Sequence, residues 1–137
     1  MSSSRNLVAD IVDTLWTGYV AAMRKYAVFR GREAFPVFAK FWAVYALIYA
    51  ASYLGDLLLS TIWKNFFFCR LLVKIVHALP FLSVTARRLH DADRSGWWML
   101  WPPLAVKAIL SPGTEGPNRF GARPPRGDGA APDGGPA

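Results

Sequence analysis

Residues 35–59 read FPVFAKFWAVYALIYAASYLGDLLL, and this apolar run decides the fold. A helix that crosses a bilayer needs about 20 predominantly apolar residues. The stretch 41–55 carries no charge, while Lys40 lies near the start of the run and Asp56 near its end. The Lys40 amine can reach an interface while its stem stays in apolar surroundings. The run therefore predicts a first transmembrane helix over 35–59.

A second apolar run follows a turn near Ser60 and Thr61, over residues 62–86. It is interrupted by Lys64, Arg70, Lys74 and His77, so its pattern fits either a second span or a buried amphipathic helix. Taken as a span, it forms a two-helix transmembrane hairpin with 35–59. Cys69 lies within this run and is the only cysteine, which excludes an internal disulfide.

The segment before the hairpin predicts an amphipathic helix over 7–26, because apolar residues recur there at the helical period. Such a helix lies in a membrane interface or packs on neighbouring helices, and the sequence leaves both open. A basic turn follows, so that residues 1–34 form an amphipathic helix and a turn that precede the membrane domain of residues 35–110.

The segment after the hairpin begins with a polar loop and continues with a short apolar stretch, residues 97–110. Segments this short are more often interfacial or re-entrant than spanning. Residues 111–137 form a polar tail rich in Pro and Gly, and we expect disorder over 127–137. The predicted fold class is an all-α membrane protein.

Composition indicates a membrane as the partner. The chain is 53% hydrophobic and 18% charged, against about 25% charged in an ordinary soluble domain. The net charge of +7 fits nucleic acid or an anionic membrane face. The basic residues flank apolar runs rather than forming one patch with a helix to read a groove, so we expect membrane lipids and no nucleic acid as partners. Other membrane subunits or a second copy are further possible partners.

Loop charge predicts the orientation. Basic residues precede the first span and follow the second, whereas the turn between them has only Lys64 nearby. Positive residues favour the cytoplasmic side, so we expect both basic loops and the N-terminus in the cytoplasm of a bacterium, with a multi-pass protein in its inner membrane.

Two polar faces are expected to meet inside the hairpin. One face lies on each predicted span, and an antiparallel hairpin pairs them in register. The residues of this predicted polar seam are Tyr45, Tyr49, Asp56, Arg70, Lys74 and His77. Each unpaired cation at membrane depth costs about 2.5–3.5 kcal/mol on insertion scales, and ring faces and an aspartate offset part of that cost. The seam is either a pathway for an anion or a proton, or a structural contact.

The basic loops could bind lipid phosphate, since guanidinium groups form bidentate contacts with phosphate. The candidate phosphate-binding residues are Arg30, Arg32, Arg87, Arg88 and Arg94. The motif loop after the second run holds His90, Asp91, Asp93, Ser95, Gly96 and Trp97. Three possible ligands on one loop, without another His or Cys, make a weak metal site, so no metal or other cofactor is expected. Asp93 or Ser95 can cap the next helix, and Asp91 can pair with an arginine.

Three stretches resemble the domain-of-unknown-function 805 family of bacterial inner-membrane proteins. They are the Phe-Arg-Gly-Arg of 29–32, the long motif LSVTARRLHDADRSGWW of 82–98, and GTEGPNRFG of 113–121. The resemblance covers about residues 19–124. It implies a multispanning inner-membrane protein and no established activity. The apolar segment between the last two motifs is shorter here than is usual in that family.

The expected function is non-enzymatic, because no nucleophile–base pair, phosphate loop or carboxylate pair is present. We expect an accessory or interaction subunit of the inner membrane that contacts anionic lipid through its basic loops. The alternative is a component of an anion- or proton-conducting transporter that uses Arg70, Lys74 and His77.

Overall fold

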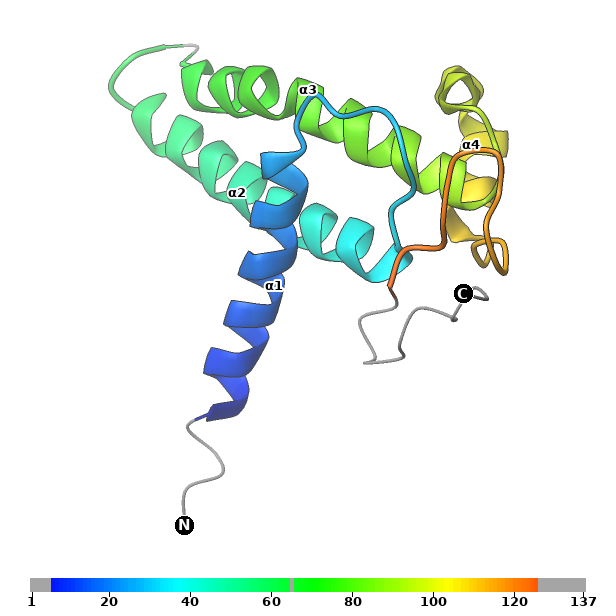
Figure 1. The fold of residues 1–137 in the computed structure, drawn as a ribbon. Coiled ribbons are helices and arrows are strands. Elements are labelled where there is room, and N and C mark those ends of the chain that lie inside the picture. The colour runs from blue at the N-terminus through cyan, green and yellow to red at the C-terminus, as the bar shows by residue number, and fades with distance from the viewer. Residues whose placement is uncertain (1–5, 65, 126–137) are drawn as a thin grey trace.

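A computed structural model describes residues 6–64 and 66–125. Within them the chain is helical, and the β contact they contain is an isolated bridge between Asn118 and Gly121. The elements are α1 (Asn6–Arg24), α2 (Phe35–Leu59), α3 (Phe68–Asp91), the 3₁₀ helix η1 (Gly96–Leu100) and α4 (Pro102–Leu110). The predicted all-α class is confirmed. Figure 1 shows α2 and α3 as a long pair that runs side by side, with α1 crossing it and η1 and α4 at one end.

The bounds of α2 agree with the predicted first span, 35–59. Pro36 stands in the first turn, where its missing N–H has no partner to lose and its fixed φ suits a helix. The run then continues without a breaker until Ser60. The local sequence alone therefore sets both ends of this helix.

The bounds of α3 correct the predicted second span, 62–86. The helix begins at Phe68 and ends at Asp91. The apolar residues Ile62, Trp63, Phe66 and Phe67 belong to the connection, and their hydropathy led to a predicted span that starts too early. The charged residues at 87–91 remain helical because partners from distant segments satisfy them, which the local pattern could not show.

Both long helices present apolar side chains on their outer surfaces. Exposed residues include Leu47 and Leu58 of α2 and Ile75 and Val76 of α3. By length and hydropathy, α2 and α3 are long and apolar enough to cross a membrane. Exposed apolar patches of this extent are unusual on water-soluble monomers.

The helix α1 has two halves with different surroundings. In the second half, Tyr19 and Ala22 pack with Phe41 of α2 and Val84 of α3 to form the core. Gly18 lies directly on the Lys40 side chain, where an added Cβ would stand 2.6 Å from the lysine Cδ. The first half extends away from the pair with its apolar side chains exposed (Figure 1). One half is therefore a packing helix, and the other presents an unpartnered amphipathic surface.

The last helix is too short to cross a bilayer. Nine residues of α4 rise about 14 Å, whereas the hydrocarbon core is about 30 Å thick. The chain then returns to the end of α3, where the Thr114 N–H donates to the Asp91 carbonyl over 2.8 Å. Residues 111–120 thus pack against the end of α3 and the turn before α2. The disorder expected over 127–137 falls outside the described residues.

Candidate functional site: a buried arginine cluster

Three arginines and two carboxylates meet where α2 begins and α3 ends. Arg32 and Glu33 come from the turn before α2, and Arg87, Arg88 and Asp91 come from the last turns of α3. Each of the five is at most 7% exposed. We call this set the arginine cluster. Charged side chains are rarely buried to this degree unless paired, so their partners decide what the cluster can do.

Asp91 joins two of the arginines. Its Oδ1 accepts from Arg32 Nε at 3.0 Å and lies 2.8 Å from Arg32 Nη2. Its Oδ2 accepts from Arg88 Nη1, one helical turn away. The carboxylate therefore bridges the turn before α2 and the end of α3. The carboxylate of Asp91 also leaves no room for a Cβ at Gly113, because an added carbon would overlap Oδ2.

Arg87 pairs with the second carboxylate and with the turn after α1. Its Nε donates to Glu33 Oε2 over 3.0 Å. Its Nη1 donates to the carbonyl oxygens of Lys25 and Val28. Arg87 therefore ties α3 to the whole connection between α1 and α2.

Backbone carbonyls from the C-terminal segment accept the remaining bonds. Arg32 donates to the carbonyls of Thr114 and Gly116, over 2.7 and 2.6 Å. Arg88 donates to those of Ile109 and Ser111. Three cations thus face two carboxylates and a set of carbonyl dipoles. The cluster links the turn 25–33, the end of α3, the end of α4 and the segment 111–121.

This geometry corrects part of the predicted phosphate site. Arg32, Arg87 and Arg88 are buried and bonded to protein groups, so lipid phosphate cannot reach them without breaking the cluster. Arg30 and Arg94 remain exposed. The sequence grouped these five residues by charge alone, and burial separates them into three that hold the fold and two that face outward.

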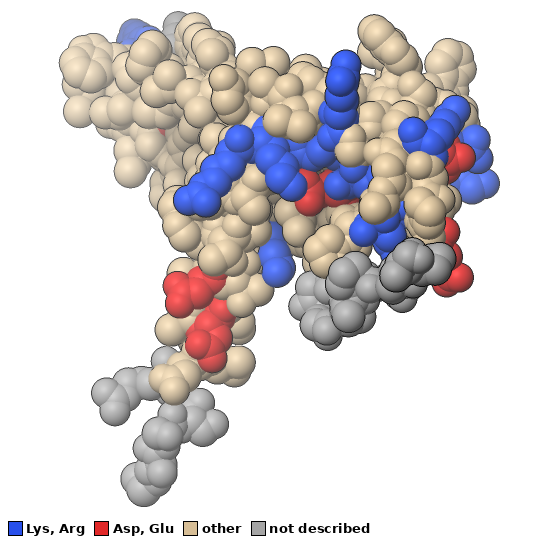
Figure 2. All heavy atoms as spheres, in the orientation of Figure 1, with Lys and Arg blue, Asp and Glu red and all other residues tan. Residues whose placement is uncertain are grey.

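Figure 2 shows where the charges gather. On the face shown, Lys and Arg side chains collect over the part of the molecule that carries the arginine cluster, while the opposite part, around the connection of α2 and α3, is almost uniformly uncharged. This gathering of Lys and Arg toward one end is the asymmetry expected for a helix pair in a membrane, where basic residues favour one side.

The motif loop is held by the same segments. His90 stacks on Phe120 with ring centroids 3.9 Å apart, and its Nδ1 lies 3.0 Å from the Gly31 carbonyl. Asp93 pairs with Arg119 at 3.2 Å. Ser95 caps η1, where its hydroxyl accepts from the Trp97 N–H. Gly96 packs closely on Ala86, since an added Cβ at position 96 would stand 3.1 Å from the Ala86 Cβ. The loop residues lie together, and a turn at 118–121 that the Asn118–Gly121 bridge closes packs on them through the stacking of Phe120 on His90.

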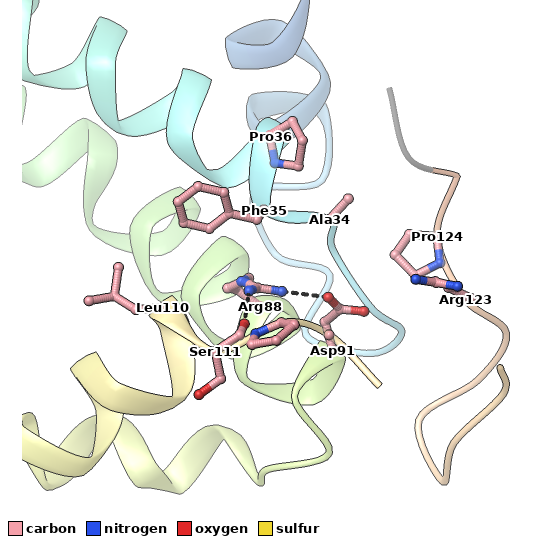
Figure 3. Close-up of a pocket in the computed structure, with 11 residues that line it drawn as sticks. Ala34, Phe35, Pro36, Arg88, Asp91, Leu110, Ser111, Arg123 and Pro124 are labelled. Carbon is pink, nitrogen blue, oxygen red and sulfur yellow. Dashed lines mark hydrogen bonds and ion pairs between the residues drawn. The ribbon is translucent and has the colours of Figure 1, made fainter. Parts of the chain in front are cut away.

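A cavity of about 490 Å³ opens beside the cluster. Figure 3 shows the Arg88–Asp91 pair at its centre, with Phe35 and Leu110 on one side and Arg123 and Pro124 on the other. The Arg88 guanidinium also lies over the Phe35 ring, 5.3 Å from its centroid. Arg88 and Asp91 are paired with each other, so the centre of the cavity is a polar floor between apolar walls.

The predicted polar seam is present as contacts between α2 and α3. The Arg70 Nε donates to Asp56 Oδ2 over 2.8 Å. Lys74 lies over Tyr49 at 5.6 Å, and the Tyr45 and His77 rings are 5.1 Å apart. The pairing register expected for an antiparallel hairpin is observed.

The side chains of Arg70, Lys74 and His77 do not all face the same way. Lys74 is exposed, and with Arg70 it borders a cavity of about 240 Å³. His77 is buried and faces α1, where its Nε2 lies 2.8 Å from the Tyr19 hydroxyl. Its Nδ1 lies 2.8 Å from the Val73 carbonyl, which can only accept, so Nδ1 carries a proton. Both nitrogens of His77 are thus bonded to the protein.

Comparison with known proteins agrees with these motifs. The profile of the family described as "Protein of unknown function (DUF805)" matches residues 26–122. The chain belongs to this family. The match begins at the turn that supplies Arg32 and Glu33 and ends with the segment that closes on His90, so the arginine cluster lies wholly within the DUF805 region.

Two curated proteins from Escherichia coli K12 are similar in sequence to this DUF805 chain. Inner membrane protein YhaI is 31% identical over 114 residues, which cover 77% of this chain and 93% of YhaI. Inner membrane protein YhaH is 34% identical over 117 residues, which cover 77% of this chain and 94% of YhaH. No solved structure matches the chain.

The sequence did not reveal which arginines are buried. Glu33 was not singled out, although it is the carboxylate that pairs with Arg87. The carbonyls of 109–116 carry no side-chain signature at all. The one usable signal was Gly113, since a glycine at the start of a fixed motif often marks a close approach of another chain segment.

Proposed function

We propose that this DUF805 chain is an integral inner-membrane protein that acts as an accessory or interaction subunit. The observation that carries the proposal is the pairing of two long helices with apolar outer faces, α2 and α3, with a charged end that the arginine cluster holds rigid. In this arrangement α2 and α3 form the transmembrane hairpin. The two relatives named as inner membrane proteins support the placement.

The orientation follows from the charged end. Turn 25–33, the end of α3 and the segment 111–121 are on one side, together with most of the basic residues. Positive residues favour the cytoplasm, so the N-terminus and the cluster face the cytoplasm and the connection 60–67 faces outward. Among the five arginines named for lipid contact, Arg30 and Arg94 are the ones placed to touch anionic lipid.

Cysteine accessibility tests the placement. In a Cys69→Ser background, intact cells carrying Thr61→Cys or Glu115→Cys would be treated with a maleimide that crosses only the outer membrane. We expect labelling at 61 and, at 115, labelling only after the inner membrane is permeabilised. The reverse pattern would invert the orientation, and labelling of both in intact cells, or a chain extracted by alkaline carbonate, would contradict a spanning hairpin.

An accessory role predicts a stable partner. Purification in mild detergent from cells at native expression should retain another membrane protein or a second copy of this chain. A Gly113→Ala variant that loosens the cytoplasmic end should lose that partner while remaining in the membrane. A wild-type chain that purifies alone and monomeric would contradict the role.

A transport role is the second candidate. The cavity beside Arg70 and Lys74 favours it, since the exposed Lys74 ammonium there can attract an anion. His77 faces α1 and does not line that cavity, so the three residues do not form a continuous path. Anion or proton flux in proteoliposomes of the purified chain, lost in Lys74→Leu, would support transport over the accessory role.

A further inference from the structure

A separate cavity of about 520 Å³ lies between α3, η1 and the turn before α2. Phe29 closes one side, η1 forms a second wall through Gly96, Trp97, Met99 and Leu100, and α3 forms the third through Leu82, Ala86 and His90. The volume falls within the range of about 300–1,000 Å³ that is usual for small-ligand sites. Its lining is mainly apolar, so a ligand must bring an apolar part.

The apolar lining continues onto the outer surface of the helix pair. Leu82 borders the cavity and is itself exposed on the outward face of α3, as is Leu79 one turn earlier. At the η1 side, Trp97 is 79% exposed and Leu100 is 71% exposed. Tryptophan is enriched at the headgroup level of membranes. A hydrocarbon chain lying along α3 could therefore enter the cavity without crossing a polar surface.

Two unpaired cations stand beside this cavity. Arg30 directly follows Phe29, and Arg94 directly precedes Ser95, and both neighbours border the cavity. Both arginines are exposed, and within residues 6–64 and 66–125 neither forms an ion pair. The Arg94 guanidinium lies over the Trp98 ring, 4.6 Å from its centroid. The contact between Gly31 and His90 brings the segment of Arg30 to the segment that leads to Arg94.

We propose that this cavity binds one acyl chain of an anionic phospholipid, whose phosphate is held by Arg30 and Arg94. The apolar lining selects against a soluble anion, and the two uncompensated cations select against an uncharged lipid. The cavity's continuity with the outer face of α3 makes the bilayer the source of the ligand. This inference rests on the proposed membrane placement and names the site through which the chain would contact anionic lipid.

Photo-crosslinking locates the acyl chain. The full chain is reconstituted in nanodiscs that contain phosphatidylcholine and a small fraction of phosphatidylglycerol with a diazirine on one acyl chain. After illumination, mass spectrometry should find adducts concentrated at 82–90 and 96–100. Adducts spread evenly along the outer faces of α2 and α3 would overturn the proposal, because they would report bulk lipid.

A filled cavity tests the site with a matched control. Leu82→Trp places a larger side chain at the border of the cavity, and both Leu82 and Leu79 are exposed enough that a tryptophan does not disturb the core. We expect Leu82→Trp to remove most of the adducts at 96–100 and Leu79→Trp to leave them near the wild-type yield. Equal yields in the two variants would overturn the cavity as the binding site.

Charge variants test the headgroup contact. Arg30→Gln and Arg94→Gln should each reduce the preference for phosphatidylglycerol over a phosphatidylcholine probe about five-fold, from about 1 kcal/mol for each basic residue near an anionic surface. Arg24→Gln, an exposed arginine at the end of α1, should leave the preference unchanged. An undiminished preference in the double variant would overturn the phosphate contact.

The proposed membrane placement fails in a different way. Wild-type protein that does not enter nanodiscs, or that carbonate extracts from cells, contradicts the placement itself. Wild-type protein that enters nanodiscs and still gives no localised adducts contradicts only the lipid site.

Discussion

At the scale of single residues, burial separates arginines that the sequence treats alike. Arg32, Arg87 and Arg88 hold the fold, while Arg30 lies outside the arginine cluster although it is two positions from Arg32. Replacing a buried ion pair with apolar residues is often neutral, whereas removing one partner leaves an uncompensated charge. The arginine cluster therefore determines which segments meet, and it contributes less to the net stability of the fold.

A single added carbon at Gly113 tests the contacts of the arginine cluster. In Gly113→Ala the new Cβ overlaps the Asp91 carboxylate, which Arg32 and Arg88 hold in place. We expect a loss of about 1–3 kcal/mol, the cost of breaking a charge-assisted hydrogen bond. Thermal unfolding in detergent should show a lower midpoint.

Gly55→Ala is the matched control for that change. A Cβ at Gly55 has only the Cys69 sulfur as a neighbour, at 4.0 Å, and alanine favours the helix. Its unfolding midpoint should equal or exceed that of the wild type. A Gly113→Ala protein as stable as Gly55→Ala would mean that Asp91 is not held as described.

The carboxyl groups show how far prediction from sequence could reach. The pairing of Asp56 with the start of α3 followed from the helical period and an antiparallel turn, which are local rules. The pairing of Glu33 with Arg87 joins residues 54 positions apart through a turn whose path no periodicity describes. Local patterns therefore predicted the seam and, within the cluster, only that Asp91 pairs with an arginine.

At the scale of the elements, α3 depends on α2 for its first turn. The cap position Phe67 offers no side-chain acceptor, and the Cys69 and Arg70 N–H groups donate instead to the Asp56 carboxylate, over 2.9 and 3.1 Å. Unsatisfied N–H groups at a helix start are costly in apolar surroundings, and a carboxylate there also suits the helix dipole. The late start of α3 at 68 is the position at which Asp56 can reach it.

Removing this borrowed cap should loosen the start of α3. In Asp56→Ala we expect a loss of about 0.5–2 kcal/mol for the cap, with a further loss from the unpaired Arg70. Hydrogen–deuterium exchange should rise at the amides of 68–71. Ser60→Ala, at the end of α2, removes only a hydroxyl bonded to its own helix and should leave that exchange unchanged. Equal exchange in the two variants would argue against the cap.

At the scale of the whole molecule, hydropathy predicted the helices well, whereas the contacts between distant segments could not be predicted from the sequence. The helix class and the bounds of α2 followed from composition and one proline. The end of α3 and the packed segment 111–120 did not, because carbonyls from distant segments satisfy their charges.

The proposed placement of the helix pair in lipid predicts opposite effects of replacing two cations. Lys74 is exposed and lies over the Tyr49 ring, so Lys74→Leu should remove an insertion cost of up to about 2.5–3.5 kcal/mol at the loss of about 0.5–1 kcal/mol of cation–π attraction. Arg70→Leu leaves Asp56 buried without its side-chain partner. In a membrane-insertion assay the first variant should insert as well as or better than the wild type, and the second worse. The opposite order would place Lys74 in a polar path.

The distance along the chain between the partners of the arginine cluster has a consequence for biosynthesis. Arg32 donates to a carbonyl that is 82 residues later in the sequence. A ribosome that has released the turn before α2 must therefore translate almost the entire domain before that guanidinium finds its acceptors. A nascent chain that stops just short of Thr114 would leave the buried Arg32 guanidinium without its carbonyl acceptors at Thr114 and Gly116, and so would differ from a finished protein in a way that proteases and chaperones can recognise.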